Sequence, residues 1–436
     1  MDPGRDGMSD VFERCRRFHD DAEYARELGH PTSPRMAEAL GLNPYLIPLE
    51  KSGGPEAIVQ GRRFLMAGSN NYLGMTAHPY VQSAAIDAVR RFGTGCTGSR
   101  FLNGTLELHL LLEERLARFV GKDSALVFST GYQTNLGVVS ALLARGDVVA
   151  ADRDVHASLI DGIHLAKGKH ALTAHYFRHN DPASLETILA SQSEGTGRLV
   201  VVDGVYSTSG EVAPLPRLIE VCKRYGARLL VDDAHGLGVL GGGRGTPHEL
   251  GCVDGVDLIV GTFSKSLASC GGFVAGPREV IHWIQHYARS FMFSASLPPA
   301  NAATVLAVLD LIEREPDLVV RVNATADRVR RELRALSYDV GDSRAAIVPI
   351  CVGDPFRTVQ AWRHFFDAGI YVNAVLPPAV PPRRSSLRTS YMSTHTENHI
   401  DELLGAFAGL RERVMRLAPS ARTRRPAAGR LAEEVP

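Results

Sequence analysis

From about residue 80 to residue 275 the chain alternates short apolar runs with longer stretches of helical periodicity. The apolar runs predict strands at 125–129, 148–151, 199–202, 228–231 and 258–260. The stretches between them predict helices such as 134–144, 183–190 and 215–225. Several of the runs are apolar throughout, which is typical of strands covered on both faces in a mostly parallel sheet. The pattern therefore predicts an α/β domain.

Other patterns flank this region. Residues 9–28 have the pattern of a charged amphipathic helix, and short strands are predicted at 57–59 and 63–67. Residues 297–415 contain longer helices and two strands, near 346–351 and 371–374, which indicates a separate α+β lobe. We therefore expect an N-terminal helical arm (1–60), a large domain (61–296), a smaller C-terminal domain (297–415) and a disordered tail (416–436).

Composition excludes several classes of function. The chain has 48 basic and 48 acidic residues, so its formal net charge is zero and a nucleic-acid-binding surface is not expected. No apolar run approaches the roughly 18 residues that a membrane span needs, and the polar N-terminus is not a signal peptide. The six cysteines contain no CxxC pair, so we expect no metal site and a cytoplasmic protein with reduced thiols.

One lysine follows a predicted strand within a run of hydroxyl residues. Lys265 stands in the segment Gly-Thr-Phe-Ser-Lys-Ser at 261–266, just beyond the apolar run at 258–260. A lysine that binds an aldehyde cofactor must be neutral for part of its cycle, and burial lowers the pKa of an amine. The hydroxyls of Thr262 and Ser264 suit a phosphate anchor. Taken alone, Lys265 is equally well explained as a surface lysine after a strand.

A carboxylate and an imidazole follow the neighbouring predicted strand. Asp232 and His235 stand in Val-Asp-Asp-Ala-His at 231–235, and ligands of open parallel sheets bind at the carboxyl ends of the strands. A pyridine cofactor needs one carboxylate to keep its ring nitrogen protonated, and Asp232 fits that role. His235 could donate to the phenolic oxygen of the cofactor. Alone, the two residues would be read as a turn cap and a structural histidine.

Two further segments complete the candidate site. Ser-Thr-Gly-Tyr at 129–132 joins a strand to a helix, where free backbone N–H groups bind phosphate and Gly131 permits close approach. His156 follows the predicted strand 148–151 and could lie over the cofactor ring. The Gly-rich segment 93–100 lacks the spacing of a nucleotide-binding loop. Together these groups predict an enzyme that holds pyridoxal phosphate as a Schiff base on Lys265.

At these residues the chain resembles the α-oxoamine synthase family of fold-type I pyridoxal phosphate enzymes, from about Asn43 to Phe407. The matching motifs are Asn71-Tyr72-Leu73-Gly74, Gly98-Ser99-Arg100, Ser129–Asn135, Asp203–Ser207, Val231–His235, Gly261–Ser266 and the segment 294–299. Within the family, the bacterial serine palmitoyltransferase branch is most similar, through Gly261–Ser266, Phe177–Asn180, Tyr371–Asn373 and His395-Thr396. The resemblance implies a fold-type I transferase.

The resemblance also implies roles for individual residues. Lys265 would hold the cofactor and abstract the Cα proton, and Asp232 would pair with the ring nitrogen. His156 would stack on the ring and contact the substrate carboxylate, while Ser207 and His235 would bond the phenolic oxygen. The phosphate would be bound by Gly131, Tyr132, Thr262 and Ser264. Arg388 would bind the substrate carboxylate, and in the implied homodimer Asn71, Tyr72 or Ser294 would reach the partner's active site.

The implied reaction is a decarboxylative Claisen condensation of a small amino acid with an acyl thioester, on coenzyme A or on an acyl carrier protein. Serine, glycine, alanine and threonine stay open as substrates, because this chain has Leu376 where the branch carries an arginine before Pro-Pro-Ala. A different fold-type I reaction, such as aminotransfer, is a competing interpretation, and a catalytically inactive partner subunit is another. The presence of Lys265, Asp232 and His156 argues against the inactive subunit.

Overall fold

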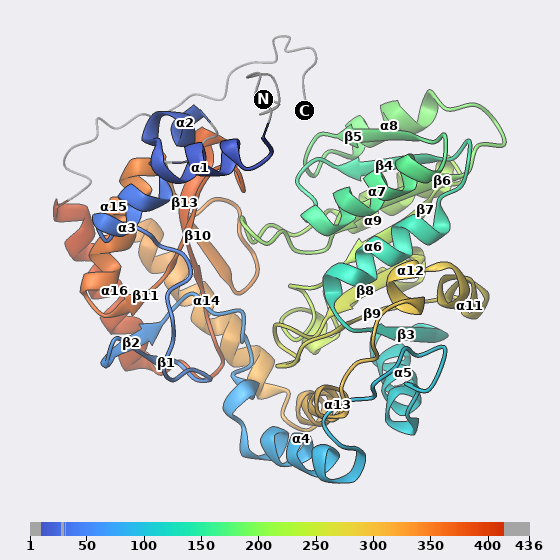
Figure 1. The fold of residues 1–436 in the computed structure, drawn as a ribbon, viewed down its shortest axis with the longest axis horizontal. Helices are drawn as coiled ribbons and strands as arrows, with labels where there is room; N and C mark the ends of the chain where they lie inside the picture. Colours follow the sequence, from blue (N-terminus) through green and yellow to red (C-terminus); the bar gives the residue numbers. More distant parts are fainter. Residues whose placement is uncertain (1–9, 28–29, 31, 414–436) are drawn as a thin grey trace.

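A seven-stranded sheet forms the centre of the larger domain in the computed structural model, which describes residues 10–27, 30 and 32–413 (Figure 1). Its strand order is β3-β9-β8-β7-β6-β4-β5, and β9 alone runs antiparallel to both neighbours. The strands are β3 (Ser124–Phe128), β4 (Val148–Asp152), β5 (Thr173–Phe177), β6 (Arg198–Asp203), β7 (Arg228–Asp232), β8 (Leu258–Thr262) and β9 (Gly272–Gly276). The predicted α/β fold with a mostly parallel sheet is confirmed.

Successive residues of the central strands pack into different cores on the two faces of the sheet. In β4, Val149 and Ala151 belong to one buried cluster, and Ala150 belongs to the other. Both sets are apolar because helices cover both faces, which explains why these strands do not alternate with polar residues. The first cluster is covered by α6 (Gly131–Leu142), α7 (Ala157–Lys169), α11 (Arg278–Tyr287) and α12 (Arg289–Met292).

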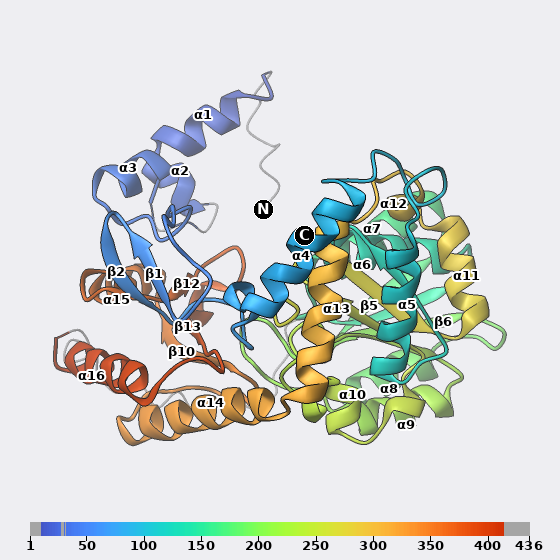
Figure 2. The ribbon, with the colours of Figure 1, turned by 90° about the horizontal axis from the view of Figure 1, so that it is seen from below.

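The opposite face is covered by helices from distant parts of the chain. Figure 2 shows α4, α5 and α13 lying side by side there. The helices of this face are α4 (Pro79–Phe92), α5 (Glu107–Val120), α9 (Leu215–Arg224) and α13 (Pro299–Arg314), and α8 (Pro182–Ala190) packs against α9. Short helical turns lie at α10 (Thr246–Glu249) and in three 3₁₀ segments, Met75–Ala77, Gly241–Gly243 and Val253–Gly255.

The smaller domain contains two three-stranded sheets. Strands β10 (Ile347–Gly353), β13 (Ser385–Ser390) and β12 (Asn373–Val375) form an antiparallel sheet in that order. Strands β1 (Glu56–Val59), β2 (Arg62–Met66) and β11 (Ile370–Tyr371) form the other. The helices are α14 (Asp317–Ala335), α15 (Pro355–Asp367) and α16 (Glu397–Arg413), with a 3₁₀ turn at Pro382–Arg384.

The packing divides the chain differently from the expected boundaries at 61 and 297. Strand β2 pairs with β11, and Phe64 and Leu65 are buried in the core of the smaller domain. Helix α13 lies beyond residue 297, but Val305 and Val308 are buried in the core of the larger domain. Apolar pattern alone cannot decide such boundaries, because it shows that a face is buried but not against which partner.

Two short helices stand in place of the single predicted helix at 9–28, and a third short helix follows them. They are α1 (Glu13–Asp20), α2 (Ala22–Glu27) and α3 (Pro34–Ala39). Asp21 has an extended backbone between α1 and α2, and its Oδ1 accepts the Glu23 N–H at 2.8 Å, so a capping carboxylate divides the helix. The predicted disordered tail at 416–436 lies outside the described residues.

Candidate active site

A cavity of about 340 Å³ lies at the carboxyl ends of the parallel strands of the large domain. Strands β4, β6, β7 and β8 are neighbours there, and the last residues of β6 and β7, Asp203 and Asp232, are register partners. Loops that leave parallel strands at one edge bring distant segments of the chain together. The lining comprises Thr130, Gly131, Tyr132, Asn135, His156, Ser158, Asp203, Val205, Ser207, Asp232, Ala234, His235, Val260, Gly261, Thr262, Ser264, Lys265, Cys270 and Gly271.

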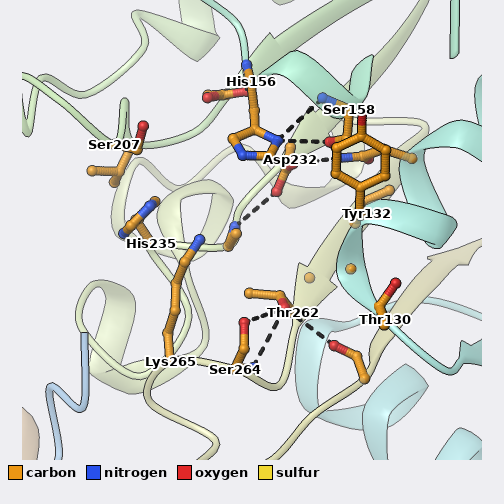
Figure 3. A pocket seen from close by; sticks show the side chains of 18 of the residues that line it. Thr130, Tyr132, His156, Ser158, Ser207, Asp232, His235, Thr262, Ser264 and Lys265 are labelled. Carbon is orange, nitrogen blue, oxygen red and sulfur yellow. Dashed lines mark hydrogen bonds between the residues drawn. The ribbon is translucent and has the colours of Figure 1, made fainter. Parts of the chain in front are cut away.

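Lys265 extends into this cavity from the loop that follows β8. Figure 3 shows its amine beside His235 and facing the Asp232 side of the cavity. Burial lowers the pKa of the Lys265 amine to about 8, with a further lowering by the Arg388 cation, while Asp232 and Asp203 act in the opposite direction. The lowered pKa leaves a useful fraction of the amine neutral, as required of a nucleophile that attacks an aldehyde.

Asp232 is held in one orientation by two donors. Its Oδ2 accepts the Asn135 amide at 2.6 Å, and its Oδ1 accepts the Ala234 backbone N–H at 3.1 Å. Asn135 is buried on α6, and its amide also contacts the Ser158 hydroxyl at 2.9 Å. The carboxylate therefore lines the cavity with a fixed direction and can stabilise a positive charge there.

His235 is buried beside the lysine as a neutral imidazole. Burial lowers its pKa well below the usual value, and the Lys265 and Arg388 cations lower it further. The Tyr72 hydroxyl lies 2.7 Å from His235 Nδ1. This contact fixes the ring, so the other ring nitrogen is available to the cavity.

His156 lies at the start of α7, where its ring caps the helix. Its Nδ1 lies 2.7 Å from the Ser158 hydroxyl and accepts the Ser158 N–H at 3.3 Å. The His156 backbone N–H donates to Asp203 Oδ1 at 3.3 Å, and burial beside Asp232 raises the pKa of Asp203 well above the usual value. Figure 3 shows the imidazole at the opposite side of the cavity from Lys265, where it could lie over a planar ligand.

The end of the cavity formed by Thr130, Thr262 and Ser264 is suited to bind an anion. Thr130 caps α6, its side chain accepting the Gln133 N–H at 3.1 Å, and the first N–H groups of a helix have no partner within it. A Cβ on Gly131 would lie 2.7 Å from Thr262 Oγ1, so glycine alone lets the helix start approach β8. Thr262 Oγ1 and Ser264 Oγ are 2.9 Å apart beside it.

These groups match the three reactive parts of pyridoxal phosphate. Lys265 could reach the aldehyde, Asp232 could pair with the ring nitrogen, and the start of α6 with Thr262 and Ser264 could hold the phosphate. Asn135 Oδ1 is a buried acceptor without a partner among the described residues. The donors and acceptors present therefore fit this cofactor. Among the described residues no cluster could hold a metal ion.

Arg388, the expected carboxylate anchor, lies outside the cavity lining, as do Asn71 and Tyr72, which were expected to reach the partner's active site. Arg388 on β13 donates from Nε to the Ser207 carbonyl at 2.6 Å and from Nη2 to Asn70 Oδ1 at 2.9 Å. Tyr72 is buried against His235. Asn71 is turned away from the cavity, because its amide donates to the Gly53 carbonyl at 3.1 Å and to Thr76 at 2.8 Å.

Three functional candidates escaped the sequence analysis. Asn135, Ser158 and Asp203 all touch the groups that line the cavity. Asn135 and Asp203 lie inside motifs that the family resemblance covers, at 129–135 and 203–207, so a residue-by-residue reading of these motifs could have found them. Ser158 carries no such signal, because it is an ordinary first-turn serine of a helix.

Most of the chain compares closely with known enzymes. The model of the family described as aminotransferase class I and II matches residues 64–407. The chain belongs to this family, whose fold and site define a pyridoxal phosphate enzyme. It is 43% identical over 379 residues to serine palmitoyltransferase of Sphingobacterium spiritivorum, covering 87% of this chain and 94% of the relative.

Two further comparisons agree. The chain is 42% identical over 372 residues to 8-amino-7-oxononanoate synthase of Geobacter sulfurreducens, covering 84% of this chain and 94% of that one. A solved structure described as serine palmitoyltransferase with PLP internal aldimine superimposes with a TM-score of 0.86 at 34% identity, covering 93% of this chain and 99% of that one. Within the family the chain is therefore an α-oxoamine synthase, similar to serine palmitoyltransferase.

Proposed function

We propose that the protein condenses a small amino acid with an acyl thioester, with loss of carbon dioxide, to give an α-amino ketone. A bond forms between Cα of the amino acid and the acyl carbon, the thiol leaves, and the carboxyl group departs as carbon dioxide. The observation that carries this proposal is the grouping of Lys265, Asp232 and His156 around one cavity. The similarity to serine palmitoyltransferase along most of the chain selects this reaction over aminotransfer.

The cofactor supplies an electron sink for the charge that develops on Cα when its proton leaves. Lys265 would take that proton, since its amine lines the cavity and has a pKa of about 8. Asp232 would keep the ring nitrogen protonated, and His235 with Ser207 would bond the phenolic oxygen. His156 would cover one face of the ring and so limit the size of the amino acid that fits.

The substrate carboxylate is bound by Arg388. Two of its nitrogens are already held by protein oxygens, and Nη1 has no hydrogen-bond partner among the described residues. A preoriented guanidinium is suited to a carboxylate because its N–H groups lie in one plane. Leu376, at the position of the missing arginine, is buried in the core of the smaller domain and offers no second cation.

The identity of the thioester and the assembly state form part of the proposal. Coenzyme A and an acyl carrier protein both present a thioester on a flexible arm, and either fits the condensation.

A homodimer is favoured by large apolar side chains that lie exposed, among them Leu102 and Phe293, which adjoins Ser294. Ser294 contacts Gln133 of its own chain at 3.2 Å. We place the enzyme in the cytoplasm. No described helix is long and apolar enough to span a membrane.

The direct test is to incubate the purified holoenzyme with serine, glycine, alanine or threonine and with acyl thioesters of several chain lengths. Each thioester is supplied both on coenzyme A and on a carrier protein. Mass spectrometry should detect an α-amino ketone together with the free thiol. A keto acid formed from the amino acid, with no carbon–carbon bond, would indicate aminotransfer and contradict the proposal.

Asp232→Asn is expected to slow exchange of the Cα proton by about 100-fold, because a neutral partner loses about 2–3 kcal/mol of charge-assisted hydrogen bonding. NMR of the amino acid in deuterated water measures this exchange without the thioester. Asp233→Asn is the matched control. Asp233 is the next residue and is also buried, but its carboxylate contacts Thr246. Wild-type exchange in Asp232→Asn would contradict the assigned role.

A further inference from the structure

A second polar cluster lies outside the cavity, around His179 in the loop after β5. His179 Nδ1 lies 3.0 Å from Asp152 Oδ1, and its Nε2 lies 2.6 Å from Glu211 Oε2. The side chain of Asp152 is 1% exposed and that of His179 is 14% exposed. With a carboxylate on each ring nitrogen, both nitrogens can donate, so the geometry suits an imidazolium that bridges two acids.

The two acids of the cluster belong to different segments. Asp152 ends β4 and also accepts the N–H groups of Asp154 and Asn180, so it is fixed to the large domain. Glu211 belongs to the turn 204–213, which connects β6 to α9. Within that turn the Tyr206 N–H donates to the Glu211 carbonyl at 3.0 Å, and the Tyr206 ring meets the His179 ring at 4.3 Å. His179 therefore ties the turn to the end of β4.

The same turn contacts the smaller domain at two carbonyls. Ser207 accepts from Arg388 Nε at 2.6 Å, and Gly210 accepts the Arg344 N–H at 2.9 Å. Gly210 has a φ of +67°, and a Cβ there would lie 2.6 Å from the Ile347 carbonyl oxygen. The turn is thus pressed against the sheet that carries Arg388. Its position sets the position of the Ser207 carbonyl, and that carbonyl orients the guanidinium.

We propose that His179 is a positioning residue for amino-acid binding, which acts by holding the turn 204–213, and hence the Ser207 carbonyl, against Arg388. The inference rests on the proposed role of Arg388 as the carboxylate anchor. His179 itself contacts neither the cavity lining near Lys265 nor the guanidinium. It acts through Glu211 and the backbone of the turn.

The charge of His179 makes this arrangement dependent on pH. Burial favours the neutral ring, but the bonds to Asp152 and Glu211 outweigh it and raise the pKa of His179 to about 9. Asp154 Oδ2 lies 3.8 Å from Nδ1, and Arg384, which pairs with Asp154 at 3.3 Å, is the cation on the facing domain. The pKa of His179 in the folded protein exceeds the ordinary histidine value of 6.5. The stabilisation that the protonated ring gives to the turn is therefore complete below pH 6.5 and is lost as the pH rises through about 9.

The test measures amino-acid binding to the holoenzyme through the change in cofactor absorption, with L-serine, glycine and L-alanine as probes. His179→Gln and Glu211→Gln should each raise Kd by about tenfold, the scale of one lost charge-assisted bond of about 1.4 kcal/mol. The double variant should bind no more weakly than the weaker single variant, because both changes break one interaction. Arg178→Gln is the control, since it removes a neighbouring exposed cation that pairs with Asp181.

A pH series separates positioning from a general structural role. The amino-acid affinity of wild type should fall as the pH rises through about 9, where His179 loses its proton. The variant His179→Gln keeps all other titrating groups, so its affinity should fall less over the same pH range. Wild-type affinity in both single variants, additive losses in the double variant, or a parallel loss of cofactor and thermal stability would each overturn the inference. Arg388→Lys distinguishes the two proposals. If Arg388→Lys binds amino acids normally, Arg388 is not the carboxylate anchor. If Arg388→Lys binds weakly but His179→Gln binds normally, only the positioning role of His179 is wrong.

Discussion

Lys265→Ala is expected to abolish condensation, lowering the rate by about 10⁴-fold or more, because the covalent anchor and the proton-transfer base are lost together. The variant should still bind pyridoxal phosphate, since the start of α6, Thr262, Ser264 and Asp232 are unchanged. Absorption spectra should then show the free aldehyde in place of the imine band of wild type. Activity of the variant above a few per cent of wild type would contradict the assignment.

Borohydride reduction of the wild-type holoenzyme provides the matching positive result. It should remove the imine band and leave the cofactor covalently on Lys265, identified by mass spectrometry of the peptides. Lys122 is a built-in control, because burial also lowers the pKa of its amine. That amine is held by the carbonyls of Val253 and Val256 and lies outside the cavity lining, so it should remain unmodified.

The low pKa of Lys265 adds a pH dependence to cofactor capture. With a pKa of about 8, roughly a tenth of the amine is neutral at pH 7, against well under a thousandth for an ordinary lysine. The rate at which the apoenzyme forms the imine band should therefore rise with pH and level off above about 8. A rate that continued to rise to pH 10 would show that burial does not lower this pKa.

The sequence predicted the parts of the fold that have a strong apolar pattern. The five strands predicted between residues 125 and 260 are present, because burial on both faces of the sheet makes their central residues apolar. Strands β5 and β9 of this sheet were missed, as was β13 of the smaller domain. Strand β5 lies at the edge of the sheet, where Thr173 and Tyr176 are exposed, and β9 begins and ends with glycine. Strand β5 lacks the pattern of a buried strand, whereas β9 is buried throughout but has only three apolar residues between its glycines.

The candidate site could be predicted only as far as its residues follow strands. Asp232, Lys265 and His156 each stand within a few residues of a strand end, and parallel strands bring such ends to one edge. The direction of a side chain depends on contacts from distant segments. Asn71 and Tyr72 are adjacent in sequence, but one bonds Gly53 and the other bonds His235. The bridge from Asp152 through His179 to Glu211 likewise joins three segments that no local pattern connects.

Arg388→Ala is expected to weaken amino-acid binding by about 100-fold or more, since removing one partner of a buried ion pair costs about 3–5 kcal/mol. Arg388 is 7% exposed, so water replaces the lost guanidinium poorly. Cofactor binding should persist, because Arg388 does not line the cofactor cavity. Titrating the cofactor spectrum of wild type and variant with serine, glycine, alanine and threonine measures the loss. Binding as tight as that of wild type would show that another group is the carboxylate anchor.

The same titrations address the choice of amino acid. Because Leu376 is buried in the smaller domain and supplies no cation, the proposed carboxylate anchor Arg388 has no second arginine at that position to assist it. All four amino acids should then lose affinity by a similar factor in Arg388→Ala, since each carries the same carboxylate. Differences among them in wild type report contacts to the side chain. If serine alone saturates the wild-type enzyme, a hydroxyl contact near His156 selects the substrate, and the absence of the arginine has not broadened specificity.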